Sequence, residues 1–337
     1  MIKDIMPGFE LYQPTTVADA LSLSDRFGKN GWKMAGGKDS LDWFKDRVKQ
    51  DKATSVLPPK AVIDLGGLAD LKGVKETADG IEIGALTTLT EVEKNPIVNA
   101  KFGLLAAAAR RVASPQIRNA GTIGGNVAQD SRCWYYRYGL PCYRAGGNTC
   151  FADTPAGMNR EHALFEASRC VSVSPSDTAP ALVALEAKMV VRSSKGERVI
   201  DAENFFVLPG TDITRMTVLE PGDILTAIRI PAKWAGAKFY FEKVADRNTW
   251  DFALVNIAAV KLMDGDTVKD VRVAAGGVQN TPKRLKVVED TVKGQKITPE
   301  LAQLAGTAAT RGARPLNYNH FKVPLLANLV SRALRAA

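Results

Sequence analysis

Four cysteines in one short segment are the residues of this chain best suited to chemistry. They are Cys133, Cys142, Cys150 and Cys170, and the other residues of the 337-residue chain include no cysteine. Four thiolates brought together by one loop suit a tetrahedral Zn²⁺ or a four-cysteine iron–sulfur cluster. The spacing C-x8-C-x7-C-x19-C is wider than the knuckles of zinc sites and favours the larger cluster. Zinc, plain thiols and disulfides remain as alternatives.

The residues around these cysteines support a buried anionic group. Positions 131–170 hold five arginines, no lysine, Trp134 and four of the seven tyrosines of the chain. Arginine donors would compensate the charge of the thiolates, and aromatic rings would exclude water from them. His162 lies between two of the cysteines and could donate to a cluster sulfur, although we expect it at the surface.

Two glycine-rich turns indicate a second site, for an anion. They are AGGKDS at 35–40 and GTIGGN at 121–126. Consecutive backbone N–H groups between small residues can form an anion-binding nest, and two such turns could hold one pyrophosphate from both sides. An ordinary tight turn is the alternative for each. Neither turn has the G-x-G-x-x-G or P-loop pattern, which argues against a Rossmann NAD site and an NTPase.

Alternating helical and strand-like patterns must position these residues. A helix over 17–27, capped by Thr15 or Thr16, precedes the first turn, and an Ala-rich helix over about 102–112 precedes the second. Strands are expected at 61–65 and 81–86. Beyond a Pro- and Gly-containing boundary at 227–238 we expect strands near 239–245, 254–263 and 269–275, the last two joined by an Asp-Gly turn, and helices near 298–310 and 323–336.

Composition excludes several classes of protein. The net charge is +9, but the basic residues are spread along the chain without a run of five, so we expect no nucleic-acid partner. No apolar stretch reaches the roughly 18–20 residues of a membrane span. The N-terminus lacks the zones of a secretory signal, so a cytoplasmic location is expected, and co-export with a signal-bearing partner to the periplasm is the alternative. The two histidines, His162 and His320, are far apart, so we expect no His-based acid/base site or hydrolase triad, and we assign no catalytic residue.

Further motifs accompany the two turns in a fixed order and carry a family resemblance. With them, the whole chain resembles the medium, flavin-carrying subunit of the molybdenum hydroxylases, which include xanthine and carbon-monoxide dehydrogenases and aldehyde oxidoreductases. The further motifs are PSDTAPALVALEA at 175–187, FFVLPG at 205–210, ILTAIRIP at 224–231, FEKVADRNTWDFALV at 241–255 and VAAGGVQNTPKR at 273–284.

The resemblance implies an α+β fold in two domains. Residues 1–230 resemble the FAD-binding domain of the vanillyl-alcohol-oxidase/xanthine-dehydrogenase type, with subdomains at about 1–55 and 56–230. Residues 235–337 resemble the C-terminal α+β domain of the medium subunit. The cysteine-rich stretch 130–172 is then an insertion, similar to that of the subgroup with an extra [4Fe–4S] cluster, as in periplasmic-type aldehyde oxidoreductases and 4-hydroxybenzoyl-CoA reductase. The four cysteines would be the cluster ligands.

The resemblance also implies which residues bind FAD. Asp177 would contact the sugar–phosphate portion or adenosine, Leu225 would pack on the ring system, and Lys243 would lie near the isoalloxazine. A helix N-cap is the alternative for Asp177, and a surface lysine on a strand is the alternative for Lys243. The pyrophosphate would lie between two sets of residues, one from each turn. These sets are Ala35, Gly36, Gly37, Lys38, Asp39 and Ser40 from the first turn, and Thr122, Gly124, Gly125 and Asn126 from the second.

The first turn departs from the family pattern at Lys38-Asp39, where many relatives have His or Gln followed by Ser or Thr. Lys38 could pair with a phosphate or be a solvated loop cation, and we leave both open.

Electron transfer is the function that the resemblance implies. A molybdenum-cofactor large subunit would transform the substrate of a heterotrimer, and a small subunit with two [2Fe–2S] clusters would pass electrons to FAD in this oxidoreductase subunit, which delivers them to an external acceptor. The alternatives are the flavin subunit of an aromatic acyl-CoA reductase of the 4-hydroxybenzoyl-CoA type, a stand-alone flavin oxidase, and a zinc-stabilised adaptor without flavin.

Overall fold

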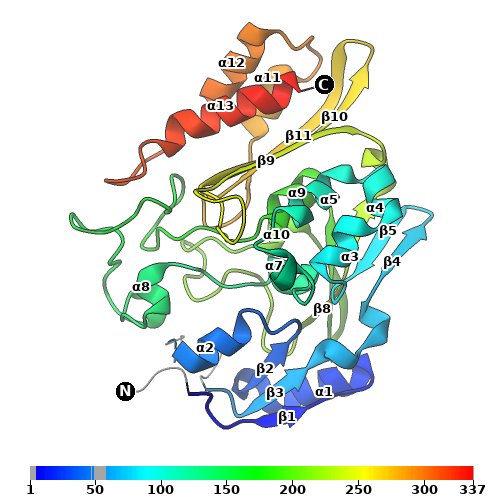
Figure 1. The fold of residues 1–337 in the computed structure, drawn as a ribbon, viewed down its shortest axis with the longest axis vertical. Helices are drawn as coiled ribbons and strands as arrows, with labels where there is room; N and C mark the ends of the chain where they lie inside the picture. Colours follow the sequence, from blue (N-terminus) through cyan, green and yellow to red (C-terminus); the bar gives the residue numbers. More distant parts are fainter. Residues whose placement is uncertain (1–4, 47, 49–57, 337) are drawn as a thin grey trace.

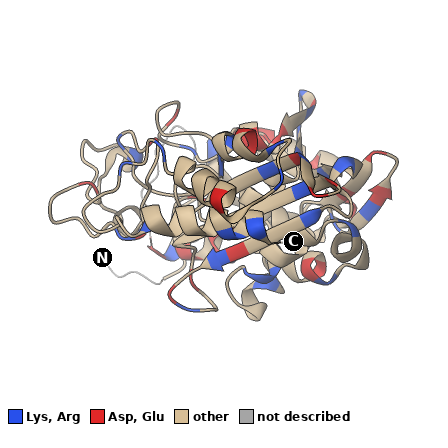
Figure 2. Ribbon diagram, turned by 90° about the horizontal axis from the view of Figure 1, so that it is seen from above, with Lys and Arg blue, Asp and Glu red and all other residues tan. Residues whose placement is uncertain are grey.

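The computed structural model describes residues 5–46, 48 and 58–336, which form three β-sheets with helices packed against them (Figure 1). A three-stranded sheet lies at one end of the molecule, a four-stranded sheet with three helices lies at the other, and a five-stranded sheet lies between them. Basic and acidic residues are interspersed along the ribbon (Figure 2). No helix of the described residues is long and apolar enough to cross a membrane.

The first sheet is parallel, with strand order β1-β3-β2 and bounds β1 Glu10–Tyr12, β2 Gly31–Met34 and β3 Ala61–Asp64. Helix α1, Val17–Phe27, connects β1 to β2, as the sequence predicts. It begins after Thr16, whose hydroxyl accepts a hydrogen bond from the N–H of Asp19 at 3.1 Å and so satisfies one of the free donors of the first turn. Its buried Ala20 shares a core with Ile63 of β3.

Strand β3 corrects one boundary of the sequence analysis. We placed 61–65 in the second subdomain, but this strand pairs with β1 on one side and β2 on the other. Its first three residues are fully buried, whereas β1 and β2 are partly exposed. A parallel sheet needs an apolar central strand, and here that strand comes from beyond position 55.

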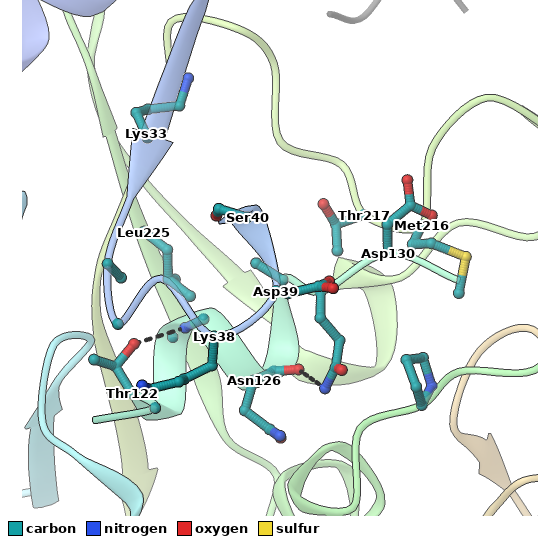
Figure 3. Close-up of a pocket in the computed structure, with 18 of the residues that line it drawn as sticks. Lys33, Lys38, Asp39, Ser40, Thr122, Asn126, Asp130, Met216, Thr217 and Leu225 are labelled. Carbon is teal, nitrogen blue, oxygen red and sulfur yellow. Dashed lines mark hydrogen bonds between the residues drawn. The ribbon is translucent and has the colours of Figure 1, made fainter. Parts of the chain in front are cut away.

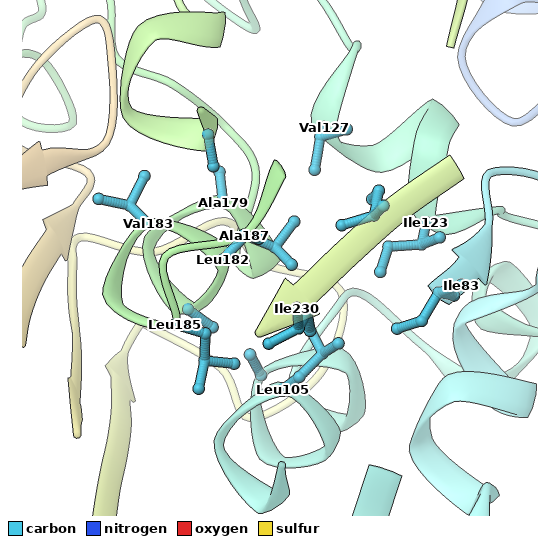
Figure 4. Packing of buried hydrophobic residues seen from close by; sticks show 14 of the residues in the cluster. Ile83, Leu105, Ile123, Val127, Ala179, Leu182, Val183, Leu185, Ala187 and Ile230 are labelled. Carbon is cyan, nitrogen blue, oxygen red and sulfur yellow. The ribbon is translucent and has the colours of Figure 1, made fainter. Parts of the chain in front are cut away.

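The second sheet is antiparallel, with the order β4-β5-β8-β6-β7. Strand β8 comes from far along the chain and lies between β5 and β6. The segment that connects β5 to β6 carries the second glycine turn and all four cysteines, and both of its ends are therefore held in the same sheet. The core on this sheet includes Ile83, Leu105, Ile123, Leu182 and Ile230 (Figure 4). The strands are β4 Val74–Thr77, β5 Gly80–Gly84, β6 Lys188–Ser193, β7 Gly196–Asp201 and β8 Ile224–Pro231, and the helices near them are α3 Leu89–Lys94, α4 Pro96–Lys101, α5 Gly103–Arg110, α7 Ile123–Val127, α9 Thr178–Ala184 and α10 Ala202–Phe205.

The third sheet is an antiparallel meander in the order β12-β11-β10-β9. The expected strands are confirmed as β9 Lys238–Val244, β10 Val255–Asp264 and β11 Thr267–Gly276, and β12 is Lys283–Arg284. The Asp-Gly turn joins β10 to β11, with Gly265 at a φ of 54° that favours glycine. The two expected helices are confirmed as α12 Pro299–Ala308 and α13 Lys322–Arg335, and α11 is Lys286–Val292.

Short elements complete the described chain. They are α2 Ser40–Asp46, α6 Pro115–Arg118, α8 Trp134–Arg137 and the 3₁₀ turns Gly28–Asn30, Leu65–Gly67, Ala69–Leu71, Tyr143–Ala145 and Ala232–Trp234. The cysteine segment, residues 130–172, contains only α8 and one of these turns, so most of its backbone is irregular.

Candidate functional site

One cavity of about 540 Å³ collects the residues expected to bind the cofactor (Figure 3). Its wall comes from both glycine turns, from β8 and from the loops 214–224 and 250–252. Lys243 is the one expected residue that does not line it. The twelve that do are Ala35, Gly36, Gly37, Lys38, Asp39, Ser40, Thr122, Gly124, Gly125, Asn126, Asp177 and Leu225.

The two glycine turns lie directly against each other. A Cβ on Gly36 would stand 2.0 Å from the carbonyl oxygen of Ala120, the residue before the second turn, so only glycine fits at this contact. Gly37 has a φ of 68°, a backbone conformation that L side chains rarely adopt. A Cβ on Gly124 would stand 2.7 Å from the carbonyl oxygen of Ala85. The glycines therefore let three stretches of backbone approach one another around the cavity.

Polar donors of both turns belong to residues that line the cavity. The N–H groups of Gly36 and Gly37 donate to no acceptor in the described part of the chain. The Oδ1 atom of Asn126 accepts from the hydroxyls of Ser176 at 2.7 Å and Thr178 at 2.6 Å, which orients its NH₂ group as a donor without an acceptor among the described residues. These groups can bind an anion, and they match the chemistry of a pyrophosphate.

The polar side chains of the first turn have different surroundings. The hydroxyl of Ser40 accepts a hydrogen bond from the indole Nε1 of Trp32 at 2.8 Å. The carboxylate of Asp39 is paired with arginines of the cysteine segment. Lys38 is exposed at the edge of the cavity, a position compatible with both of its alternatives.

Asp177 and Lys243 form a buried ion pair. The Nζ atom of Lys243 donates to Oδ2 of Asp177 at 2.6 Å and to the carbonyl oxygen of Arg111 at 3.0 Å, and Asn256 donates to Oδ1 of Asp177 at 2.9 Å. Burial raises the pKa of Asp177, and the ammonium of Lys243 opposes this shift. The surface alternative for Lys243 is therefore wrong, because its side chain is only 4% exposed.

The helix α9 follows Asp177 directly, but the carboxylate makes no capping hydrogen bond to it, since both of its oxygens are occupied by Lys243 and Asn256. These contacts join the start of α9, next to the cavity, to Lys243 on β9 and Asn256 on β10 of the third sheet.

Several residues that line the cavity escaped the sequence analysis. Lys33 on β2 donates to the carbonyl oxygen of Pro221, and burial lowers its pKa to about 8. Met216 and Thr217 come from the loop before β8, and Trp250 comes from the loop between β9 and β10. The loop before β8 carries no pattern that could have identified it, whereas Trp250 lies within the motif at 241–255 and could have been found there. Lys33 could have been found from its place on the strand that leads into the first turn.

The four cysteines surround one small cavity of their own. Arg144 lies in its wall and is fully buried, with only 1% of its surface exposed. Its guanidinium donates to Asp130 and to the carbonyl oxygen of Ile213 at 2.7 Å. Tyr136 is also buried there, and Arg144 lies 5.5 Å from the centre of its ring. The expected arginine and aromatic surroundings of the cysteines are thus present.

The four cysteines form no disulfide with one another, and backbone N–H groups act on the thiols of Cys133, Cys142 and Cys150. Burial raises the pKa of Cys133 to about 12, while the N–H groups of Tyr136 and Tyr135 oppose the shift. Burial also raises the pKa values of Cys142 and Cys150, and backbone N–H groups again act in the opposite direction. Backbone donors of this kind stabilise thiolate ligands. No group of three or more His, Cys, Asp or Glu side chains in the described chain is placed to hold a metal ion.

His162 is buried, so its expected surface position is wrong. Its Nε2 atom lies 3.3 Å from the sulfur of Cys133, and its Nδ1 atom has no hydrogen-bond partner among the described residues. Burial lowers its pKa to about 4, which keeps the ring neutral at pH 7. The backbone carbonyl of His162 accepts from Lys322 of α13 at 3.0 Å, which ties the cysteine segment to the C-terminal helix.

Comparison with known proteins agrees with this arrangement. Residues 7–233 match the family model described as the FAD binding domain in molybdopterin dehydrogenase, and residues 240–337 match the CO dehydrogenase flavoprotein C-terminal domain. The chain therefore belongs to the family of FAD-binding subunits of molybdopterin dehydrogenases. It is 31% identical to the carbon monoxide dehydrogenase medium chain of Hydrogenophaga pseudoflava, with 99% of this chain and 98% of that one covered.

Other relatives and a solved structure extend the comparison. The chain is 31% identical to the aldehyde oxidoreductase FAD-binding subunit PaoB of Escherichia coli K12, over 98% of this chain and 99% of the relative. The solved carbon monoxide dehydrogenase of H. pseudoflava superimposes with a TM-score of 0.77 at 29% identity, over 99% of this chain and 98% of that one. The relatives are FAD subunits of oxidoreductases, and the mixed helix-and-sheet fold with a separate C-terminal domain is shared.

Proposed function

We propose that this chain is the electron-transfer subunit of a heteromeric molybdenum-cofactor oxidoreductase and carries FAD in the cavity between its two glycine turns. One observation carries the proposal: turns more than 80 residues apart meet at the Gly36–Ala120 contact, and both line a single cavity. No histidine lines this cavity in the described chain, so a general acid or base for substrate chemistry on a flavin is not provided by that residue type.

The residues present fit the cofactor at its pyrophosphate. Gly36, Gly37 and Asn126 would donate to the phosphate oxygens, and Leu225 supplies an apolar surface for a ring. The pair of Asp177 and Lys243 would fix the relative position of the domains on either side of the cavity. When bound, FAD supplies the ability to exchange single electrons with iron–sulfur partners and electron pairs with an acceptor.

We propose the partners by the same argument. The relatives are medium chains and FAD-binding subunits, among them those of carbon monoxide dehydrogenase and aldehyde oxidoreductase. A molybdenum-cofactor large subunit and a small subunit with two [2Fe–2S] clusters would complete the complex. We propose that this complex is an aldehyde oxidoreductase or is similar to xanthine dehydrogenase.

The cysteine segment would hold a [4Fe–4S] cluster. Three features support this: the four thiols share one cavity, backbone N–H groups favour the thiolate form of three of them, and the positive charge of Arg144 is buried beside them. A cluster bound by four thiolates is anionic, so a buried guanidinium and backbone donors would stabilise it. The cluster would act as an electron relay or as a structural link within the segment.

The test is the visible spectrum of anaerobically purified protein, with iron and FAD measured per chain. One FAD with about four irons and a broad shoulder near 400 nm, typical of such clusters, would support both parts of the proposal. FAD without iron would reject the cluster and keep the flavin subunit. Zinc without FAD would overturn the proposal and favour an adaptor role.

A further inference from the structure

The cysteine segment reaches into the wall of the flavin cavity through two arginines. Arg137 donates from NH1 and NH2 to the two carboxylate oxygens of Asp39, at 2.9 and 3.0 Å, and Arg132 approaches Oδ1 of Asp39 at 3.2 Å. Asp39 belongs to the first glycine turn and lines the cavity, whereas both arginines flank Cys133 in the sequence. The pair of Arg137 and Asp39 is largely buried, with side chains 14% and 21% exposed.

All three guanidinium nitrogens of Arg137 donate hydrogen bonds, and its guanidinium carbon lies against an aromatic ring. Its Nε atom donates to the carbonyl oxygen of Ser131 at 2.7 Å, and its carbon centre lies 4.1 Å from the ring centre of Trp43. Trp43 is itself buried in a core that also contains Tyr136 of the cysteine segment. This side chain is therefore a fixed positive charge beside the turn, because it cannot leave Asp39 without losing several other contacts.

The charge of Asp39 makes this fixed cation important. The first turn presents free N–H groups to a site suited to a pyrophosphate, which is an anion, but it also carries a carboxylate in the same wall. Two anions in a partly buried site repel each other strongly, because water screens them poorly there. Arg137 and Arg132 oppose that repulsion by neutralising the carboxylate.

A similar pair lies within the cysteine segment itself. The buried Arg144 lines the cysteine cavity and pairs with Asp130, the residue of the segment that lines the flavin cavity just after the second glycine turn. Asp39 and Asp130 thus each pair with an arginine located between two cysteines.

We propose that Arg137 is a positioning residue of the flavin site, which cancels the charge of Asp39 so that the first glycine turn can accept the pyrophosphate. The cysteine segment is then part of the flavin site, whatever its thiols bind. This inference rests on the proposed binding of FAD, and it adds a role for residues that the family resemblance does not assign to the cofactor.

The test is a titration of the full chain, freed of FAD, with FAD as the probe and flavin fluorescence as the readout. Arg137→Gln should raise the dissociation constant about tenfold or more, the scale expected when a charged hydrogen-bond partner is removed. Arg160→Gln is the matched control, because Arg160 lies in the same segment and binds Asp246 through two hydrogen bonds of 2.7 and 2.8 Å at the surface. It should change the constant less than twofold.

If Arg137 acts by neutralising Asp39, removing the negative charge of Asp39 should compensate for the loss of Arg137. A purely structural pair predicts no such rescue. Adding Asp39→Asn to Arg137→Gln should restore most of the lost affinity, because the carboxylate that opposes the pyrophosphate is then neutral. No rescue in this double variant would overturn the proposal. Unchanged binding by Arg137→Gln would also overturn it. Failure of the unmodified chain to bind FAD would instead reject the proposed function.

Discussion

The flavin cavity and the cysteine cavity lie side by side but are built in opposite ways. The flavin cavity is framed by strands, short helices and glycine turns, and its close contacts are between backbone atoms, as at Gly36 and Ala120. The cysteine segment has almost no regular structure, and its position depends on side chains such as Arg137 and Arg144. Backbone contacts tolerate no added atom, whereas side-chain contacts tolerate substitution according to their burial. The two regions should therefore respond differently to single changes.

The largest effect is expected at the backbone contact. Gly36→Ala places a Cβ where the carbonyl oxygen of Ala120 lies 2.0 Å away, so the two turns must separate and the cavity between them must deform. We expect the purified variant to contain no FAD, or to bind it more than about 100-fold more weakly, equivalent to roughly 2.7 kcal/mol. The measurement is FAD content after gel filtration, followed by a fluorescence titration.

Gly210→Ala is the control for this change, because a Cβ at Gly210 would meet nothing within 4 Å. It should retain full FAD content. Full FAD content in Gly36→Ala as well would show that the contact between the turns does not shape the site.

The largest effect on folding stability, as distinct from FAD binding, is expected from the buried ion pair. Lys243→Met leaves the carboxylate of Asp177 buried without its cation, and this should lower the free energy of unfolding by about 3–5 kcal/mol. Urea denaturation followed by circular dichroism measures the change. Adding Asp177→Asn to the variant should recover part of the loss, because the remaining side chain is neutral. A loss below about 1 kcal/mol, the value for exposed pairs, would contradict the burial of this pair.

The lysine that attaches the cysteine segment to the C-terminal helix should make the free energy of unfolding depend on pH. Lys322 is fully buried, donates to the carbonyl oxygens of His162 and Gly277, and has its pKa lowered to about 7 by burial. Between this value and the unfolded pKa near 10.4, the unfolded chain binds more protons than the folded chain, so this group makes stability rise with pH. Its share is at most about 1.4 kcal/mol per pH unit.

Lys322→Met should remove that rise, as measured by urea denaturation at pH 7 and pH 9. Lys286→Met is the control, since Lys286 is an exposed partner of Asp290 and should leave the slope unchanged. An identical slope in Lys322→Met and the unmodified chain would show that this lysine does not titrate in the folded protein.

The smallest effect is expected at the surface of the cysteine segment. Arg160 and Asp246 form an ion pair with side chains 47% and 54% exposed, so solvent screens it. Arg160→Gln should change the free energy of unfolding by about 0–1 kcal/mol. A loss near that of Lys243→Met would mean that the segment depends on this contact as strongly as the domains depend on the buried pair.

The regular elements were largely predictable from local patterns. The helix at 17–27, the three strands of the last sheet and its Asp-Gly turn follow from short-range periodicity and capping, which act within a few residues. Local patterns did not predict which strands pair with each other in a sheet. β3 was assigned to the wrong subdomain because its neighbours in the first sheet are set by pairing between strands that are far apart in the chain.

The candidate site divides along the same line. Motifs that lie in glycine turns were visible because glycine is required by backbone geometry, which leaves a trace in the sequence itself. The loop that supplies Met216 was missed, since no local rule links it to the cavity, and Trp250 was not singled out within the motif at 241–255. Burial was also misjudged at His162, because a histidine in an irregular segment carries no periodic signal of its environment.

By itself, the sequence determined the residue types on which the chemistry depends: four thiols in one segment, two turns that only glycine can make, and arginines rather than lysines around the cysteines. Only the tertiary structure decided which of these act together. In the folded chain Arg137 pairs with Asp39 and Arg144 pairs with Asp130. Lys243 does not line the cavity and forms a buried pair with Asp177. The physical reason is that charge and burial depend on distance in space, whereas turn and helix propensities depend on distance along the chain.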